Sequence, residues 1–147
     1  MSAKPIPDGF HTVTPYLLVK EVAELLDFLS EAFDAEVLHR IELPDGSIPH
    51  AEVRIGDSKV LIGGATGGFP PMPGGLYVYV PDTDAVYQRA LKAGATPLLE
   101  PADQFYGDRN AGVRDPSGNC WWIATHIEDV SPEELQRRTI THKQKQG

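Results

Sequence analysis

The chain has 147 residues, 41% of them hydrophobic, and a formal net charge of −8 at pH 7. That length predicts one domain, or two small halves that share a core. The acidic balance argues against a nucleic-acid partner or an anionic membrane surface, since both require clustered lysine and arginine. No apolar run in the sequence approaches the roughly 18 residues needed to span a bilayer.

The first residues, MSAKPIPDGFH, do not have the apolar core of a secretory signal peptide. Cys120 is the only cysteine, so the chain has no intrachain disulfide, as a reducing compartment would require. We therefore expect a cytoplasmic protein.

The first half of the chain alternates short strands with one helix. Phe10–Val19 is β-branched and apolar, which predicts a strand with an edge position or irregularity at Pro15. Glu21–Phe33 carries apolar residues three, four and seven apart, which is typical of a helix with one buried face. Further strands are predicted over residues 36–43, 50–55 and 59–63, with turns between them.

Gly64–Gly75 contains five glycines and three prolines in twelve residues, which indicates a linker or mobile loop. The same succession of elements then begins again. A strand at residues 76–80 precedes a helix that starts at Asp82 or Thr83 and ends at Gly94. Strands are predicted over residues 96–100, 111–115 and 119–126, with a polar loop at 101–110, and Ser131 caps a C-terminal helix.

The chain therefore reads β-α-β-β-β twice, which predicts one pseudo-symmetric α+β domain. We expect two βαβββ modules that form a cupped mixed sheet with the helices outside. The expected limits are residues 8–63 for the first module, 64–74 for the linker, 75–128 for the second module and 131–147 for a helical tail.

These paired modules, with the stretches HAEVRIGD, DQFYGDR, VRDPSGN and IATHIEDVSPEE, resemble the vicinal oxygen chelate superfamily. That group includes glyoxalase I, extradiol dioxygenases and bleomycin-resistance proteins, and the likeness is greatest to its PhnB-like branch. The resemblance runs from about His11 to Glu134. It implies the fold, but the superfamily contains both enzymes and binding proteins, so activity must be argued from the site. It also implies a homodimer, because members of this length often pair modules between chains.

The resemblance implies a divalent metal held in the cup by His or Glu on the first and last strand of each module. Aligning helix starts and turns places these four positions at Thr14, Gly75, Ile62 and Trp122. None of these residue types is a good ligand: glycine and isoleucine have no donor, neutral threonine is weak, and indole offers no lone pair. We therefore expect no metal at the usual positions.

Strand alternation predicts what lines the cup instead. Trp121 faces the helices, whereas Trp122 faces the cup. By the same alternation, aromatic and hydroxyl side chains reach the cup from the first strand of each module; these are Thr12, Thr14, Tyr16, Tyr77 and Tyr79. Such a pocket suits a planar ligand with a few orienting hydrogen bonds, although the rings could instead fill the cup as a second core.

The loop Asp103–Arg109 is a further candidate. Phe105 and Tyr106 could close over a ligand, and Arg109 could pair with Asp103 or Asp108 or contact the ligand. A structural loop fixed by an Arg–Asp pair is an equally good interpretation.

Three functions remain open. The first is a metal-independent protein that binds an aromatic or cationic organic ligand, to which the acidic surface is suited. The second is a metal-dependent lyase, isomerase or dioxygenase-like enzyme with a relocated divalent metal at His50, Glu52 and His126. The third is an interaction domain with a filled cup. The sequence does not decide whether the protein is catalytic.

Overall fold

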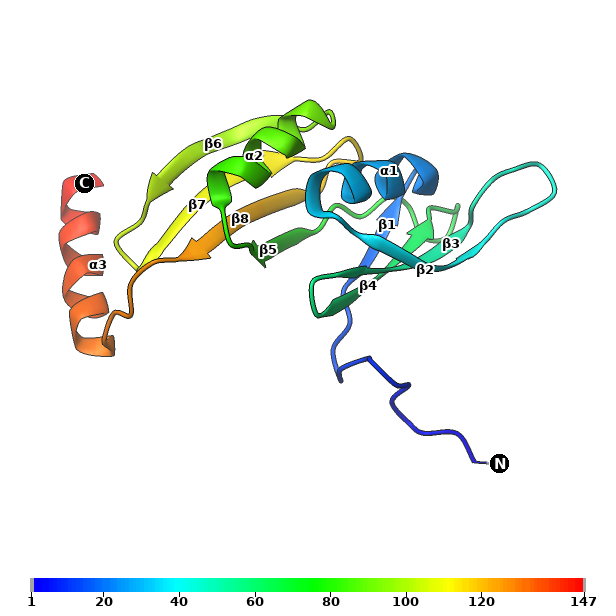
Figure 1. Cartoon of the computed structure of the whole chain (residues 1–147), viewed down its shortest axis with the longest axis horizontal. Helices are drawn as coiled ribbons and strands as arrows, with labels where there is room; N and C mark the ends of the chain where they lie inside the picture. The colour runs from blue at the N-terminus through cyan, green and yellow to red at the C-terminus, as the bar shows by residue number, and fades with distance from the viewer. Residues whose placement is uncertain (1, 147) are drawn as a thin grey trace.

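The computed structural model describes residues 2–146, and their elements follow one another as two βαβββ modules and a final helix (Figure 1). The first module contains β1 (Tyr16–Val19), α1 (Val22–Phe33), β2 (Glu36–Ile41), β3 (His50–Ile55) and β4 (Ser58–Gly64). The second contains β5 (Gly75–Tyr79), α2 (Thr83–Lys92), β6 (Thr96–Asp103), β7 (Asp108–Arg114) and β8 (Cys120–His126), and α3 (Pro132–Gln146) follows it. The predicted α+β class and module pattern are confirmed.

Each module forms its own four-stranded mixed sheet, in the order β1-β4-β3-β2 or β5-β8-β7-β6. The first and last strands of a module pair in parallel, and the other pairs are antiparallel. Helices α1 and α2 lie on the same side of the molecule and contact each other (Figure 1). Each sheet therefore has one face that packs against a helix, called here the helix face, and an opposite open face.

The helix faces form the hydrophobic core. Alternate strand residues such as Leu17, Val53 and Ile123 are buried there against the apolar side of α1 or α2. The ring of Phe33, at the end of α1, lies 4.9 Å from the ring of Trp121 on β8, measured between centroids. This contact joins the two modules through their cores, and the full burial of one such aromatic side chain contributes about 3 kcal/mol.

The predicted helix caps are present. The carboxylate of Asp82 accepts a hydrogen bond from the backbone N–H of Ala85, and the hydroxyl of Ser131 accepts one from Glu134. Each bond satisfies an otherwise free N–H group in the first turn of α2 or α3. Helix α1 ends at Asp34, which has a left-handed φ of 55° where glycine is the usual residue.

Two strand predictions need correction. The first strand covers only Tyr16–Val19 rather than the predicted Phe10–Val19, because proline lacks an N–H group for strand pairing and Pro15 ends the regular segment. The polar loop predicted at residues 101–110 is a turn of four residues, since β6 extends to Asp103 and β7 begins at Asp108. The sequence did not indicate the pairing of β6 with β7, because the strand positions near this turn carry polar residues that are typical of loops.

The predicted equivalence of Ile62 and Trp122 is wrong. Ile62 pairs with Leu17 and Ala51 and is fully buried on the helix face, whereas Trp122 lies on the open face of the second sheet.

The cause is a difference of one residue between two turns. In the first module Ile55 pairs with Ser58, with two residues between them. In the second module the N–H of Asp115 bonds to the carbonyl of Asn119, with three residues between them. The extra residue shifts the register, so Leu61 is the first-module counterpart of Trp122, and a one-residue shift exchanges the two faces of a strand.

Helix α3 lies beyond the end of the second sheet, away from the first module (Figure 1). Arg138 of this helix donates to the backbone carbonyl of Phe105 and pairs with Glu128, so the helix is tied to the β6–β7 turn. Over residues 2–146, no helix combines the length and apolar character that crossing a bilayer requires.

Candidate functional site

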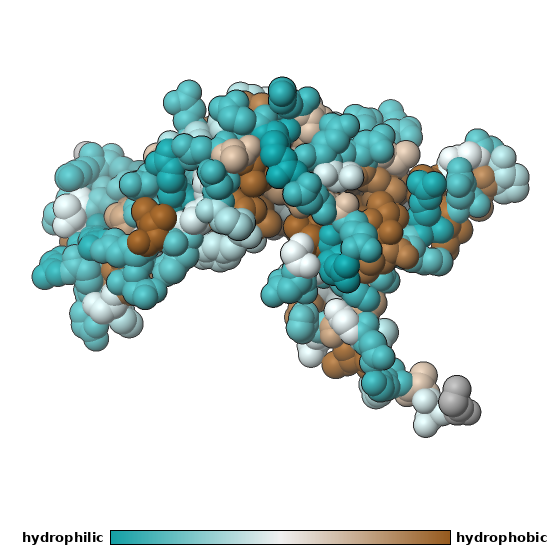
Figure 2. Space-filling model, viewed as in Figure 1, coloured by the Kyte–Doolittle hydropathy of each residue, from teal (hydrophilic) through white to brown (hydrophobic). Residues whose placement is uncertain are grey.

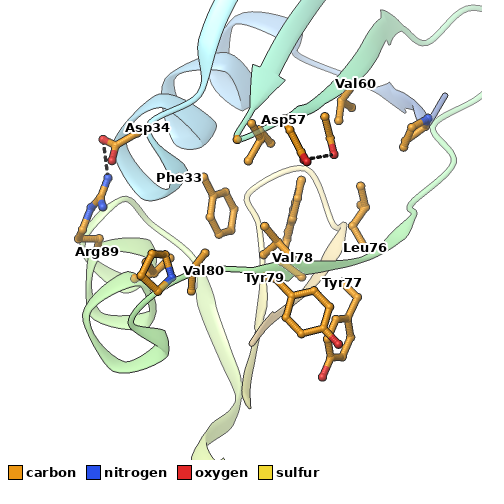
Figure 3. Close-up of a pocket in the computed structure, with 17 residues that line it drawn as sticks. Phe33, Asp34, Asp57, Val60, Leu76, Tyr77, Val78, Tyr79, Val80 and Arg89 are labelled. Atoms are coloured by element: carbon orange, nitrogen blue, oxygen red, sulfur yellow. Dashed lines mark hydrogen bonds and ion pairs between the residues drawn. The ribbon is translucent and has the colours of Figure 1, made fainter. Parts of the chain in front are cut away.

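The open face of the second sheet carries the aromatic residues. Strand pairing aligns Tyr77 with Trp122 and Gly112, and Tyr79 with Ala124 and Asn110. In Figure 3, Tyr77 and Tyr79 point away from the side where Leu76, Val78 and Phe33 gather. The predicted cup-facing positions of Tyr77, Tyr79 and Trp122 therefore share one surface.

The two neighbouring tryptophans have opposite environments. The side chain of Trp121 is 2% exposed, and its indole N–H donates to Asp115 at 2.8 Å. Trp122 is 38% exposed on the opposite face. A Cβ atom on Gly75 would lie only 3.2 Å from the Trp122 ring, so glycine there leaves room for the indole. Trp121 is thus a core residue, whereas the ring of Trp122 is partly exposed on the open face.

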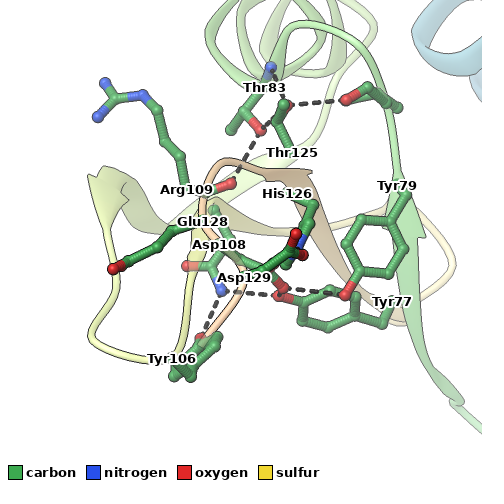
Figure 4. A network of polar contacts seen from close by, with 12 residues as sticks. Tyr77, Tyr79, Thr83, Tyr106, Asp108, Arg109, Thr125, His126, Glu128 and Asp129 are labelled. Carbon is green, nitrogen blue, oxygen red and sulfur yellow. Dashed lines mark hydrogen bonds and ion pairs between the residues drawn. The ribbon is translucent and has the colours of Figure 1, made fainter. Parts of the chain in front are cut away.

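A single carboxylate joins the tyrosine pair (Figure 4). The hydroxyls of Tyr77 and Tyr79 both donate to Oδ2 of Asp108, at 2.6 and 3.0 Å. The other oxygen of Asp108 lies 3.0 Å from Nδ1 of His126. Asp108 is 5% exposed, although its tyrosine partners are 42% and 61% exposed. The buried carboxylate therefore holds the hydroxyl groups of two solvent-exposed tyrosines in place.

These contacts change how the groups ionise. Burial alone would raise the pKa of Asp108, but the hydrogen bonds from Tyr77, His126 and Tyr79 outweigh it and hold that pKa below its ordinary value. Burial and the bond to Asp108 raise the pKa of Tyr77. The bond to Asp108 and burial raise the pKa of Tyr79. At neutral pH the site therefore contains an ionised carboxylate beneath two protonated phenols.

His126 closes one end of this network. Its Nε2 lies 2.7 Å from the carboxylate of Asp129, in addition to the Nδ1 contact with Asp108. Hydrogen bonds to Asp129 and then Asp108 raise the pKa of His126 above its ordinary value of 6.5. When it is protonated, the imidazole therefore carries a positive charge that partly neutralises the two carboxylates.

Asn110 lies beneath the rings and is 2% exposed. Its amide nitrogen donates to the hydroxyl of Tyr106 at 2.6 Å and of Tyr77 at 3.2 Å. Its carbonyl oxygen is buried and has no hydrogen-bond partner among the described residues. Leaving such an acceptor unsatisfied costs about 1–3 kcal/mol, so the polar network around Asn110 is held at some cost in stability.

The loop matches the interpretation in which an Arg–Asp pair fixes it, because Arg109 pairs with Asp103 as predicted. Arg109 lies on the helix face, where it pairs with Asp84 and Asp103, so the predicted alternative pairing with Asp108 is wrong (Figure 4). Consecutive residues of β7 point to opposite faces, which separates Asp108 from Arg109. Phe105 packs on the His142 ring of α3 at 4.6 Å, and only Tyr106 contacts the tyrosine network.

The open face of the first sheet is different in chemistry. His50 and Glu52 share it on β3, as predicted, but the carboxylate of Glu52 lies 3.4 Å from the amine of Lys59. Tyr16 is half exposed, with its ring 6.3 Å from that of His50. A hollow of about 400 Å³ lies beside Tyr16 and Phe69.

Thr12 and Thr14 precede β1, so strand alternation does not orient them. Thr14 donates to the backbone carbonyl of His11 at 3.5 Å, and Thr12 is exposed.

The residues present do not fit the metal site that the resemblance implies. Thr14, Gly75 and Trp122 supply no suitable ligand, and Leu61, which replaces Ile62 as the counterpart of Trp122, supplies none either. Within residues 2–146, no group of three His, Cys, Asp or Glu residues could hold a metal ion. His50 and Glu52 lie on one sheet and His126 on the other.

A second hollow of about 450 Å³ lies between the modules (Figure 3). It is lined mainly by apolar side chains such as Phe33, Val60 and Leu76, and the ion pair between Arg89 and Asp34 lies at its rim. It belongs to the helix faces and contains no polar network like that of Asp108.

Sequence reasoning missed the central role of Asp108 and did not consider Asn110. Alternation along Asp108, Asn110 and Gly112 would have placed both on the open face, but the predicted loop at 101–110 hid the start of the strand. Tyr77, which donates a hydrogen bond to Asp108, is about thirty residues away in the chain, so the local sequence did not indicate the contact.

The sequence profile of the Glyoxalase/Bleomycin resistance protein/Dioxygenase superfamily matches residues 9–123. The chain belongs to this superfamily. Two curated relatives are uncharacterized proteins of Mycobacterium tuberculosis H37Rv and Mycobacterium bovis. Each is 36% identical over 135 residues, which is 84% of this chain and 79% or 89% of the relative.

Solved structures show the same fold. TioX from a Micromonospora species is 25% identical with a TM-score of 0.67, covering 80% of this chain and 99% of TioX. TnmS3, an antibiotic binding protein from a Streptomyces species, is 21% identical with a TM-score of 0.60, covering 79% and 97%. The PhnB protein from Bacillus cereus is 16% identical with a TM-score of 0.60, covering 78% and 99%.

Proposed function

We propose that this chain is a metal-independent small-molecule-binding protein that takes up a planar aromatic or cationic organic ligand on the open face of its second sheet. The observation that carries the proposal is the exposed aromatic surface of Tyr77, Tyr79 and Trp122 over the buried carboxylate of Asp108. Rigid rings held at fixed positions bind flat ligands with little loss of side-chain entropy.

The exposed rings favour binding over a filled second core. Trp122 is 38% exposed and Tyr79 is 61% exposed, so their faces are accessible to a ligand in the single chain. Figure 2 shows apolar patches on one side of the molecule, but these are other side chains, because the hydropathy scale places tyrosine and tryptophan among the mildly hydrophilic residues. The net charge of −8 attracts cationic molecules at long range.

A second copy of the chain would complete the cup. Sheets β1–β4 and β5–β8 are separate, and each leaves its open face uncovered. Small-molecule sites bury most of the ligand surface, which one open sheet does not achieve. We propose a homodimer in which the open face of the first module in one copy, including Tyr16, covers the open face of the second module in the other.

The test is a calorimetric and ligand-detected NMR screen of planar aromatic probes, both neutral and cationic, against the wild-type chain and Trp122→Ala. Binding by the wild type that is lost in Trp122→Ala supports the proposal. Ile140→Ala is the matched control, because Ile140 is another exposed apolar residue but lies on α3. Failure of every probe to bind, or equal binding by Trp122→Ala, would contradict it.

An enzyme with a relocated metal is the second candidate. It is favoured by the position of His50 and Glu52 on one open face, with His126 at the end of the other. The same dimer would bring these faces together, and two imidazoles with one carboxylate are suitable ligands for several divalent metals. Elemental analysis of protein purified without chelators would support this candidate if a near-stoichiometric metal were found and then lost in His50→Ala.

A further inference from the structure

The hydroxyl hydrogens of Tyr77 and Tyr79 already take part in hydrogen bonds within the protein. A phenol has one O–H, and those of Tyr77 and Tyr79 both point to the same oxygen of Asp108. Both phenols keep their protons at neutral pH because the pKa of each is raised. Toward a ligand, each phenol oxygen therefore acts as a hydrogen-bond acceptor.

Asn110 supports the same corner from within the protein. Its two amide hydrogens go to Tyr106 and Tyr77, and its carbonyl oxygen lacks a partner within the described part of the chain. Tyr77, Tyr79 and Asn110 have no donor hydrogen left for a ligand. Because that carbonyl oxygen is buried, the acceptors exposed to a ligand at this corner are the phenol oxygens.

The charge around these acceptors is negative. The carboxylates of Asp108 and Asp129 lie on either side of the single imidazole of His126. The rings of Tyr77 and Tyr79 are 5.3 Å apart and tilted by 59°, and both are partly exposed, so electron-rich ring surface is accessible beside the oxygens. Ring faces attract cations, and hydrogen bonds donated to a carboxylate increase the electron density of the donating phenols.

We propose that the ligand presents a cationic N–H donor group, such as an amidinium, a guanidinium or a protonated amine, to the oxygens of Tyr77 and Tyr79. The remainder of the ligand, which is planar, lies over Trp122. This inference rests on the proposed function and adds the chemical identity of the ligand's polar end. Carboxylates and phosphates are disfavoured at this corner, because they supply only acceptors and negative charge.

Four probes of similar size separate the contributions of positive charge and of N–H donors to binding. Benzamidinium is planar, cationic and rich in N–H donors, and benzamide is its neutral counterpart. Phenyltrimethylammonium is cationic without an N–H donor, and benzoate is anionic. Calorimetry or ligand-detected NMR should show benzamidinium binding at least about fivefold more tightly than benzamide, phenyltrimethylammonium between them, and benzoate weakest.

Tyr79→Phe tests the acceptor directly, since it removes one exposed hydroxyl and keeps the ring. The variant should lower benzamidinium affinity by about threefold to tenfold and leave the affinity of phenyltrimethylammonium, which has no N–H donor, unchanged. Tyr87→Phe is the matched control: it removes a tyrosine hydroxyl from α2, outside the open face, and should change neither affinity.

The outcomes distinguish the two proposals. If benzamide binds and depends on Trp122 but benzamidinium gains nothing, the proposed function stands and this inference is wrong. Tightest binding of benzoate, or unchanged benzamidinium affinity in Tyr79→Phe, would also overturn the inference. If none of the probes binds, both proposals fail.

Discussion

The two modules have the same strand order and different open faces. Their helix faces are alike, with small and branched apolar residues packed under α1 or α2. On the open faces, the first module presents Glu52 beside Lys59, whereas the second presents two tyrosines fixed by Asp108. Core packing constrains only the helix face, so two copies of one fold can carry different chemistry on the other.

The largest difference is expected within β8, where the neighbouring side chains of Trp121 and Trp122 lie on opposite faces of the sheet. Trp121→Ala should lower the free energy of unfolding by about 3–5 kcal/mol, because it opens a cavity beneath Phe33 and removes one of the hydrogen bonds to the buried carboxylate of Asp115. Trp122→Ala should lower it by less than about 1 kcal/mol and abolish binding of planar probes. Urea unfolding followed by circular dichroism measures both. Similar losses of stability would mean that both rings are structural.

Removing one acidic group from each module should also give unequal effects. Asp108→Asn should cost about 1–3 kcal/mol, because the buried carboxylate accepts two phenols and contacts His126. Glu52→Gln should cost at most about 1 kcal/mol, since its contact with Lys59 is long at 3.4 Å and the Lys59 amine also donates to the backbone carbonyl of Asp8.

Chemical denaturation of both variants at pH 7 provides this test. Equal costs would contradict the central position of Asp108. Glu52→Gln acts as the control for a general effect of the altered net charge.

The second open face should also be the more sensitive to pH. Because the folded state raises the pKa of His126, the protonated imidazole stabilises the fold below its ordinary pKa of 6.5. That contribution is lost as pH rises through the elevated value. Proton loss also leaves Asp108 and Asp129 less neutralised, so cation binding should strengthen over the same range.

NMR titration of the His126 ring should show its midpoint above 6.5. In Asp129→Asn the midpoint should move back toward 6.5, since the largest cause of the shift is removed. A wild-type midpoint at or below the ordinary value would show that the two carboxylates do not hold the imidazole.

The smallest expected effect concerns the ends of the two module helices. Asp34 ends α1 with φ 55°, whereas Gly94, after α2, has φ 109°. Asp34→Gly should stabilise the protein by roughly 0.5 kcal/mol, because glycine adopts left-handed angles without steric cost. Loss of the exposed pairing with Arg89 offsets part of the gain, and Arg89→Ala measures that part separately by thermal unfolding.

The sequence by itself determined the repeat, the helices and the placement of Trp121 and Trp122 on opposite faces of one strand. Each of these depends on local periodicity or on a cap within a few residues, such as Ser131 with Glu134. The sheet position of Trp122 followed from alternation along one strand. Composition likewise indicated an acidic protein.

Only the tertiary structure decided which of these residues meet. The turn before β8 is one residue longer than the turn before β4, so Leu61 rather than Ile62 is the counterpart of Trp122, and Ile62 lies in the core. Pairing of β5 and β7 with β8 brought Asp108 beneath Tyr77, which lies on β5, and packing of α2 drew Arg109 to the opposite face. Such contacts depend on register and on which strands become neighbours, and these are set by packing across the whole module rather than by the local chain.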